Sequence, residues 1–373
     1  MRSNIKVMTT VGTRPEIIRL SRVISELDKY TDHFLLNTMQ NYDENLNEIF
    51  FKDLNIRKPD TSLSISFKTP SELIAKCIEH VDAEIRSFQP DAFLVLGDTN
   101  SCLSAIAAKR NKVPIFHMEA GNRCFDERVP EEINRKIVDH ISDINLPYSD
   151  ISREYLLREG LHPSKVIKTG SPMYEVIDYY ADKIKASSAL ENLKLTASEF
   201  FLVSFHREEN LDNSSNLRNI CLALNGIAEQ YNIPIVCSTH PRTKKQIKDL
   251  EFNSLIKFID PLCFSDYVFL QTQAKAVISD SGTITEEASI LNFPAVNLRE
   301  AHERPEGMEE AAVLLSGTNP EMIKDCLRLA IEQHETDRSF ALVNDYSMPN
   351  VSKKVVRLII SHIDFIKNKV IRD

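Results

Sequence analysis

The sequence lacks the features that mark several whole classes of protein. No uninterrupted apolar run approaches the roughly 20 residues that a membrane-spanning helix needs. The opening stretch, MRSNIKVMTTVGTRPE, has neither a long apolar segment nor a small-residue cleavage site, so it predicts a first strand rather than a signal peptide. We therefore expect a cytoplasmic protein with no membrane partner.

Metal-binding and disulfide patterns are also missing. The seven cysteines are an odd number, lie far apart and include no C-x-x-C pair, which favours reduced thiols and gives no zinc pattern. No D-x-D pair occurs, so nothing signals a metal that holds a diphosphate. We expect neither a metal nor a cofactor. The charge of a bound diphosphate would then have to be met by arginines and helix N-termini.

The charge balance argues against one class of partner. The formal net charge is −9, whereas a general nucleic-acid binder needs a basic surface that neutralises phosphates. We expect no nucleic-acid partner, although basic residues can still gather around one anionic small molecule.

Glycine is scarce, and its positions are informative. Only nine glycines occur in 373 residues. Five of them fall at or just past the end of a strand-like run: Gly12, Gly97, Gly121, Gly170 and Gly282. Such glycines predict tight turns at the carboxyl ends of strands, which is where open α/β sheets bind their ligands.

Short apolar runs alternate with helical patterns along most of the chain. We expect strands at residues 5–11, 33–38, 91–96, 113–117, 143–146, 165–168, 200–205, 234–237, 256–259, 276–279 and 294–298. Residues 60–69 predict a loop, and the chain after residue 307 predicts helix. The alternation predicts the α/β class, with two Rossmann-like doubly wound parallel-sheet domains facing a cleft.

The length supports this division, because 373 residues exceed one typical core. We expect an N-terminal domain at residues 1–171 and a C-terminal domain at 172–351. The last helix, residues 352–373, is expected to pack back on the N-terminal domain.

One stretch, residues 117–140, is unusually rich in both signs of charge. It follows an apolar run and reads HMEAGNRCFDERVPEEINRKIVDH. A loop and a helix start with ordinary ion pairs would explain it, and so would a catalytic site.

Three carboxylates stand out because each follows a predicted strand or lies in the adjoining loop: Asp98, Glu119 and Glu131. Ion pairing alone explains each one singly. Together they suit general acid/base chemistry, in which crowded carboxylates separate one another's pKa values. Glu132 and Arg135 are expected to orient Glu119 and Glu131 or to belong to the helix start.

Several residues predict a site for an anion. Thr13, Pro15 and Glu16 are explained by a capped helix, but Arg14 is a cation at the positive end of that helix unless an anion binds there. The turn Ser281-Gly282-Thr283 before a helix is a weak phosphate-loop signal, since Thr283 with Glu286 also fits a capping box. Further candidates stand just past strands or at helix starts: His206, His240 and Arg304.

At these positions the chain closely resembles the non-hydrolysing UDP-N-acetylglucosamine 2-epimerase family. The matching strings, in order, are GTRPE (12–16), GDTNS (97–101), EAG (119–121), PEEINR (130–135), HREEN (206–210), THP (239–241), SDSGTITEEA (279–288) and ERPE (303–306). They span almost the whole chain.

The resemblance implies a fold like that of the GT-B glycosyltransferases, with UDP held mainly by the C-terminal domain. Ser281, Gly282 and Thr283 would meet the phosphates, and Glu287 the ribose hydroxyls. The resemblance implies that five residues help to hold the nucleotide sugar: Arg14, Arg19, His240, Tyr267 and Arg304. It implies that four carry the chemistry: Asp98, Glu119, Glu131 and His206.

Two departures point to a subgroup. Family members that act on UDP-N-acetylglucosamine usually carry lysine at position 19 and a Q-H-R-E-like string at 40–43, whereas this chain has Arg19 and Gln-Asn-Tyr-Asp. The loop GNRCFDERVPEE (121–132), together with IIRLSR (17–22), resembles the subgroup that converts UDP-2-acetamido-2,6-dideoxy-L-talose to UDP-N-acetyl-L-fucosamine for bacterial capsule or O-antigen synthesis. The family also implies a homodimer, and the string at 40–43 argues against its allosteric second substrate site.

Chemistry sets the expected mechanism. The C2 hydrogen of such a sugar has no adjacent carbonyl, so we expect elimination of UDP to a glycal-type intermediate, followed by proton return and re-addition of UDP. The alternatives are UDP-N-acetylglucosamine 2-epimerase activity giving UDP-N-acetylmannosamine, a GT-B glycosyltransferase, a hydrolysing epimerase and a non-catalytic nucleotide-sugar sensor.

Overall fold

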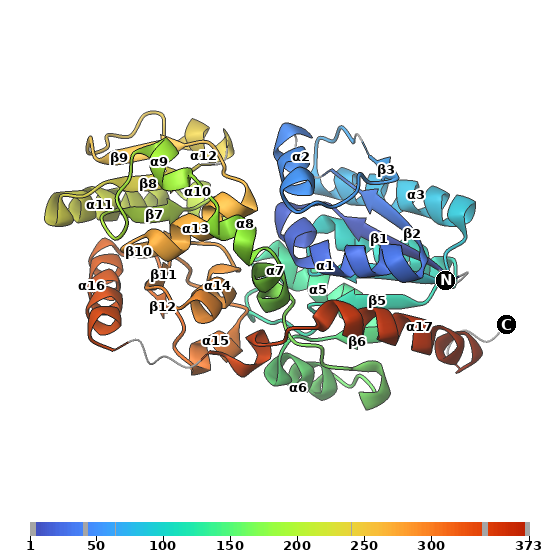
Figure 1. The fold of residues 1–373 in the computed structure, drawn as a ribbon. Helices are drawn as coiled ribbons and strands as arrows, with labels where there is room; N and C mark the ends of the chain where they lie inside the picture. The colour runs from blue at the N-terminus through green and yellow to red at the C-terminus, as the bar shows by residue number, and fades with distance from the viewer. Residues whose placement is uncertain (1–4, 40–43, 64, 240, 338–341, 370–373) are drawn as a thin grey trace. The chain divides into compact units, whose positions relative to one another are not determined.

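A parallel six-stranded sheet forms the centre of each of two units (Figure 1). The computed structural model describes residues 5–39, 44–63, 65–239, 241–337 and 342–369. One unit comprises Met1–Tyr179 with Asn344–Asp373, and the other comprises Tyr180–Val343. Within the described ranges no helix has the length and apolarity to cross a bilayer.

The sheet of the first unit has the order β3-β2-β1-β4-β5-β6. Its strands are β1 (Lys6–Val11), β2 (Asp32–Asn37), β3 (Thr61–Ser62), β4 (Ala92–Leu96), β5 (Ile115–Met118) and β6 (Ile144–Leu146). The order reverses between β1 and β4, which makes the ends of these two neighbours the topological switch point of a doubly wound sheet.

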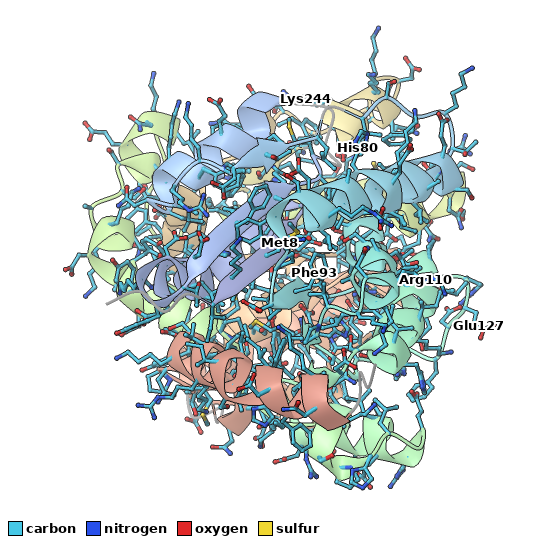
Figure 2. The ribbon with its side chains drawn as sticks, turned by 90° about the vertical axis from the view of Figure 1, so that its right-hand side faces the viewer. Met8, His80, Phe93, Arg110, Glu127 and Lys244 are labelled. Atoms are coloured by element: carbon cyan, nitrogen blue, oxygen red, sulfur yellow. The ribbon has the colours of Figure 1, made fainter. Side chains whose placement is uncertain are left out.

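Helices cover both faces of this sheet. They are α1 (Arg14–Tyr30), α2 (Glu44–Asp53), α3 (Pro70–Phe88), 3₁₀ helix η1 (Asn100–Ser104), α4 (Ala105–Arg110), α5 (Pro130–Ile141), α6 (Asp150–Arg158), α7 (Met173–Tyr179) and α17 (Val351–Lys369). On one face α3 and α4 pack over Met8 and Phe93, which are fully buried and are labelled in Figure 2. Helices α7 and α17 both contact α1 (Figure 1).

Local sequence explains where the principal helices begin. In α1, Pro15 occupies the first turn and the buried positions Ile17, Leu20 and Ile24 recur at helical spacing. In α3, the Thr69 side chain accepts a hydrogen bond from the Glu72 amide and so caps the helix.

The second unit repeats the same strand order. Its sheet runs β12-β11-β10-β7-β8-β9, with β7 (Phe201–Ser204), β8 (Ile235–Ser238), β9 (Ile256–Ile259), β10 (Ala276–Ser279), β11 (Ala295–Asn297) and β12 (Leu314–Leu315). Its helices are α8 (Ala181–Lys185), α9 (Ala189–Leu193), α10 (Glu208–Leu211), α11 (Ser214–Tyr231), α12 (Pro241–Gln246), α13 (Phe264–Gln273), α14 (Ile284–Leu291), α15 (Pro305–Glu309) and α16 (Pro320–Thr336). The switch point here lies between β7 and β10.

Alternating side chains along these strands build two cores. Phe201 and Val203 pack in one cluster with residues of α11 and α16. Leu202, the residue between them, packs in the other with residues of α13 and α14. Both faces are therefore apolar, as expected for a parallel sheet covered on two sides.

The expected α/β class and the two doubly wound sheets are confirmed, with three local corrections. Residues 61–62 form β3 where a loop was expected, and residues 314–315 form β12 where helix was expected. Residues 165–168 form no regular strand, and only Val166 makes an isolated bridge, to Asn145. Strands of two residues are too short to leave an alternating pattern in the sequence.

The division into units differs in detail from the expected domain limits. Helix α7 was assigned to the second domain, whereas it groups with the first unit. Helix α17 also groups with the first unit.

Candidate active site

The switch point of the first unit holds the turns that follow β1 and β4. Gly12 begins the first turn, and Gly97 and Asp98 begin the second. Glu16, fully buried, joins them. Its carboxylate accepts hydrogen bonds from the Gly12 and Thr13 amides on one side and from the hydroxyls of Thr99 and Ser101 on the other. Burial raises the pKa of Glu16 to about 6, against the lowering effect of these hydrogen bonds, that of Thr99 being the largest.

Asp98 is held by the first turns of α5. The guanidinium of Arg135 lies 2.6 Å from its carboxylate, and the Asn134 side-chain amide donates to its main-chain carbonyl at 2.9 Å. Arg135 is almost fully buried, and it also lies 3.2 Å from Glu132. Glu132 and Arg135 were expected to orient Glu119 and Glu131, and the contact described here joins Arg135 to Asp98.

Glu119 follows β5 directly and has an unusual backbone. Its φ of 62° lies in the left-handed region, which costs a residue with a side chain of order 1 kcal/mol or more. Arg19 of α1 lies 2.6 Å from its carboxylate, and both side chains are buried. The Asn122 amide donates to its other oxygen at 3.2 Å. A strained backbone that is held by buried polar partners is typical of a functional position.

A buried imidazole connects the ends of β4 and β5. The Nε2 atom of His117 donates to the Gly97 carbonyl at 2.8 Å, and its Nδ1 atom lies 3.0 Å from Asp139 of α5. Burial acts to lower the pKa of His117, but Asp139 and the Gly97 carbonyl outweigh it, so that the pKa is raised. His117 therefore ties the turn that carries Asp98 to the strand that precedes Glu119.

The loop between β5 and α5 is anchored at its start and exposed at its tip. Gly121 has φ 82°, and an added Cβ would lie 2.3 Å from the Ser152 carbonyl oxygen, so no other residue fits there without displacing α6. Buried Arg123 pairs with Asp139 at 2.7 Å. By contrast Phe125 is 71% exposed, and Figure 2 shows Glu127 at the periphery of the unit.

Glu131 lies in the first turn of α5 and is half-buried. Arg14 begins α1, is also half-buried, and lies with its guanidinium 5.8 Å from the centre of the Phe50 ring. Both therefore lie at helix starts that follow the strand ends described above, as the sequence predicts.

In the second unit a buried carboxylate again joins two turns at the switch point. Asp280, directly after β10, accepts hydrogen bonds from the amides of His206 and Arg207, which follow β7. The Asn210 side chain donates to it at 3.0 Å. The His206 imidazole itself is 39% exposed, and its Nδ1 atom lies 3.6 Å from the Asp280 carboxylate.

The Ser281–Thr283 turn forms a chain of hydroxyl groups. The hydroxyls of Ser281 and Thr283 lie 3.0 Å apart, and the Ser281 amide donates to Ser279. Ser204 links Ser279 to the phenol of Tyr267, at 2.8 and 2.9 Å. Tyr267 and the turn are therefore parts of one connected polar surface.

The capping-box explanation of this turn is not realised. Thr283 makes no side-chain cap of α14, and Glu286 lies 3.2 Å from the buried guanidinium of Arg304. The Arg304 amide donates to Nδ1 of His302 at 3.0 Å. Burial lowers the pKa of His302 to about 4, so this imidazole is neutral and can accept that bond.

Glu287 lies one turn into α14 and is buried. The Gln271 amide of α13 donates to its carboxylate at 2.6 Å. Beneath the turn, an added Cβ at Gly282 would lie 3.0 Å from Glu303, which itself pairs with Arg299 at 2.6 Å. The Glu303 side chain would therefore have to shift by a few tenths of an ångström to admit a larger residue at this position.

The expected site residues thus gather at two sheet edges. Around the first sheet they are Arg14, Arg19, Asp98, Glu119 and Glu131, and around the second they are His206, Tyr267, Ser281, Gly282, Thr283, Glu287 and Arg304. His240 lies outside the described residues. Residues that the sequence analysis did not single out, namely His117, Asp139, Gln271 and Asp280, support them from buried positions. Of these four, His117 gave an available signal, because it is a titratable residue inside the apolar run at 113–118.

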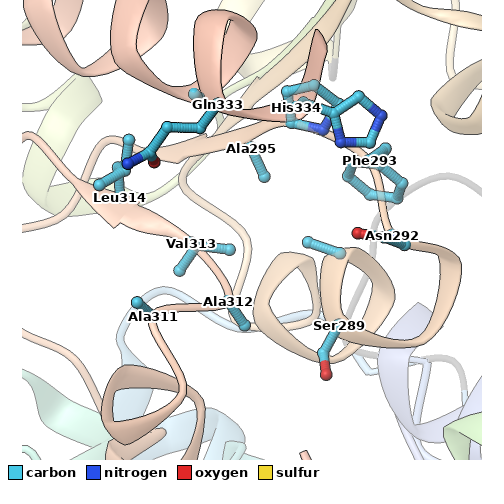
Figure 3. Close-up of a pocket in the computed structure, with 13 residues that line it drawn as sticks. Ser289, Asn292, Phe293, Ala295, Ala311, Ala312, Val313, Leu314, Gln333 and His334 are labelled. Atoms are coloured by element: carbon cyan, nitrogen blue, oxygen red, sulfur yellow. The ribbon is translucent and has the colours of Figure 1, made fainter. Parts of the chain in front are cut away.

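One pocket of the second unit lies elsewhere. It is lined by residues from the C-terminal end of α14, from the stretch before β12 and from α16, including Asn292, Val313 and Gln333 (Figure 3). The Ser281–Thr283 turn is at the other end of α14, so this pocket contains no expected site residue. Among the described residues, no group of three or more His, Cys, Asp or Glu side chains is arranged to hold a metal.

Known proteins resemble this chain over nearly its full length. A sequence model described as UDP-N-acetylglucosamine 2-epimerase matches residues 25–360. The solved structure of a UDP-N-acetylglucosamine 2-epimerase from Rickettsia bellii is 49% identical, covers 99% of both chains and has a TM-score of 0.92.

Two further relatives differ in the ligand or substrate that they name. The Methanocaldococcus jannaschii UDP-GlcNAc 2-epimerase, solved in complex with UDP-GlcNAc and UDP, is 33% identical with a TM-score of 0.90, covering 96% of this chain and 100% of that one. A UDP-2,3-diacetamido-2,3-dideoxy-D-glucuronate 2-epimerase from Pseudomonas aeruginosa is 33% identical over 332 residues, 87% of this chain and 92% of the relative.

Proposed function

This chain belongs to the UDP-N-acetylglucosamine 2-epimerase family and is a carbohydrate epimerase acting on UDP-sugars, and we propose that it inverts C2 of a UDP-2-acetamido sugar by eliminating and re-adding UDP. The observation that supports the mechanism best is the pair Asp98 and Glu119. Each follows a strand of the same sheet, on neighbouring strands, and each is held by its own buried arginine. Two fixed carboxylates are what proton transfer on two faces of one carbon requires.

The bond changes balance as follows. A base removes the C2 proton while the C1–O bond to the diphosphate breaks, which gives UDP and a 2-acetamido glycal. A second acid then returns a proton to the opposite face of C2, and a diphosphate oxygen of UDP attacks C1. Breaking the C1–O bond builds positive charge at C1, which acidifies C2–H without a neighbouring carbonyl. We assign the proton transfers to the set Asp98, Glu119 and Glu131.

The leaving diphosphate needs donors and cations. In our proposal the Ser281–Thr283 turn and the N-terminus of α14 meet the phosphates, with help from Arg14 and His206. The carboxylate of Glu287 accepts from the ribose hydroxyls, a role that its buried position beside Gln271 supports. The remaining proposed contacts to the nucleotide sugar are those of Arg19, His240, Tyr267 and Arg304.

For the sugar we propose UDP-2-acetamido-2,6-dideoxy-L-talose, with UDP-N-acetyl-L-fucosamine as product. Arg19 and the loop at 121–132 support this choice, because they carry the resemblance to that subgroup. The loop is anchored through Gly121 and Arg123, next to Glu119, while its tip is exposed. Such a segment can change its contacts to the sugar without disturbing the carboxylates. We further propose that the enzyme is a homodimer serving bacterial surface-polysaccharide synthesis.

UDP-N-acetylglucosamine is the second candidate, with UDP-N-acetylmannosamine as product. The name of the 49% identical Rickettsia bellii protein favours it. The name of the Pseudomonas aeruginosa relative gives a different sugar, a diacetamido glucuronate, but the same epimerised carbon, C2. The sugar therefore varies among relatives of this chain while the position of epimerisation stays the same.

A side-by-side assay separates the two sugars. The purified enzyme is given each UDP-sugar in D2O without any acceptor, and C2 is followed by NMR. We expect the L-talo sugar to be converted with deuterium at C2 and UDP to be conserved in total. Conversion of only UDP-N-acetylglucosamine would refute the proposed L-talo substrate. A product with only protium at C2 would refute the proposed elimination mechanism. The R19K variant tests the same choice, because it introduces the lysine typical of family members that act on UDP-N-acetylglucosamine. It should raise the rate on UDP-N-acetylglucosamine relative to the rate on the L-talo sugar.

A further inference from the structure

We infer that Glu16 is a positioning residue of the epimerase reaction, whose carboxylate holds the turn that carries Arg14 and the turn that carries Asp98 in one fixed arrangement. The inference rests on the proposed catalytic role of Asp98. Glu16 itself faces only the protein, and so it acts through its neighbours.

The contacts of Glu16 exceed what a helix cap needs. A capping glutamate at the third helical position accepts from the amide of the cap residue, and Glu16 does so from Thr13 at 2.9 Å. It also accepts from Gly12 and from two hydroxyls, those of Thr99 and Ser101, which lie 83 and 85 residues further along the chain. The oxygens of these two hydroxyls lie 2.7 Å apart.

This bridge lies where displacement would matter most. It crosses the switch point, where β1 and β4 are hydrogen-bonded neighbours and their following chains diverge. Thr99 is adjacent to Asp98, and Arg14 lies between Thr13 and Glu16. In the second unit, Asp280 crosses the equivalent point between β7 and β10 and fixes the backbone of His206. A buried carboxylate therefore joins the switch-point turns in both units.

Protonation of Glu16 would weaken the bridge. Its oxygens face two amide N–H groups that can only donate and two hydroxyls that now donate as well. A carboxylic acid carries one hydrogen, so one hydroxyl would have to turn round and accept. The pKa of Glu16 is raised by burial to about 6, within the range of an activity assay. The charge of Glu16 acts on two thiols, those of Cys77 on α3 and Cys102 in η1, whose pKa values are raised mainly by burial and further by this charge.

Kinetics of matched variants test the inference. E16Q and T99V should each lower kcat about tenfold or more with KM changed less than about threefold, since small displacements of catalytic groups cost rate. T99S, which keeps the hydroxyl, should restore the rate. E72Q is the control, because Glu72 caps α3 in the same way, through the Lys68 amide, and makes no bridge to another strand. Its kcat should equal that of the wild type.

The pH profile and hydrogen exchange complete the test. The acidic fall of kcat near pH 6 should be lost or displaced in E16Q and kept in E72Q. Amide exchange in residues 97–104 should be about tenfold faster in T99V than in T99S, whether or not the protein turns over a sugar. If E16Q does not fold, the comparison of T99V with T99S tests the inference by itself.

Wild-type kcat and unchanged exchange in both T99V and E16Q would overturn the inference. Failure of the wild type to convert either UDP-sugar would instead overturn the proposed function, and the exchange experiment would still report on the bridge.

Discussion

Helix α1 reaches the end of β5 through one side chain: Nη1 of Arg19 lies 2.6 Å from Oε2 of Glu119, and both groups are buried. Removing one partner of such a pair leaves a buried charge alone, which typically costs about 3–5 kcal/mol. We predict that R19M lowers the free energy of unfolding by about 3 kcal/mol, measured by urea denaturation at pH 7.5, and lowers kcat.

The control for R19M is R86M, on the surface of α3. Arg86 lies 2.8 Å from Asp82 but is 68% exposed, so its loss should lower the free energy of unfolding far less than the loss of Arg19. Equal losses in the two variants would mean that burial of the Arg19–Glu119 pair has no energetic consequence.

Single amide variants should assign the faces of C2. We predict that D98N, E119Q and E131Q each lower kcat by about 10²–10⁴-fold, as expected for loss of an acid/base group. A variant that lacks the base for one face should still exchange the C2 hydrogen of the other epimer with D2O without converting it. NMR of both epimers in D2O makes this measurement.

E154Q serves as the control, since Glu154 is an exposed residue of α6 that pairs with Arg158. Its rate should be that of the wild type. An amide variant with normal rate would remove that carboxylate from the proposed set.

Glu287 should matter for nucleotide affinity. Hydrogen bonds to a charged group contribute about 1.5–3 kcal/mol, so E287Q should weaken UDP binding by at least about tenfold in calorimetric titration. E229Q, an exposed position of α11, should bind UDP normally. If E287Q binds UDP with wild-type affinity, Glu287 does not contact the ribose.

His302 should make the protein less stable in acid. Its pKa falls from 6.5 in the unfolded chain to about 4 in the folded one, so folding favours the neutral imidazole. That contribution is complete above pH 6.5 and is lost as the pH falls towards 4, by about 3 kcal/mol. Urea unfolding of the wild type and of H302Q between pH 4.5 and 8 should show this slope only in the wild type.

Glu16 should make the protein less stable as the pH rises, which is opposite to the effect of His302. Its pKa rises from 4.5 to about 6 on folding, so its contribution is complete below pH 4.5 and is lost as the pH rises through 6, by about 2 kcal/mol. The difference in unfolding free energy between wild type and E16Q should therefore fall by that amount between pH 4.5 and 7.5. A constant difference would show that Glu16 titrates normally in the folded state.

Local patterns predicted the elements that are long or regularly spaced. Strands β1, β4 and β10 all lie within one residue of their expected limits. The edge strands β3 and β12 were missed because two residues leave no alternation.

The site shows the same limit of local reasoning. The local sequence explains Glu16 completely as a helix-capping residue. Its hydrogen bonds to Thr99 and Ser101 can be identified only from the structure, in which β1 and β4 are neighbouring strands. Similarly Arg135 was expected to orient a carboxylate, but that its partner is Asp98 follows from the packing of α5 against η1.

Helix α17 gives the molecule an order of assembly. The first unit takes its last helix from beyond residue 343, after the whole of the second unit has been synthesised. A growing chain can therefore complete the core of residues 180–343 while α1 still lacks the neighbour that contacts it. Until Val355 and Ile359 emerge from the ribosome and become buried, the first unit is incomplete. A ribosome that stalls before residue 351 would leave a complete second unit and a first unit without α17.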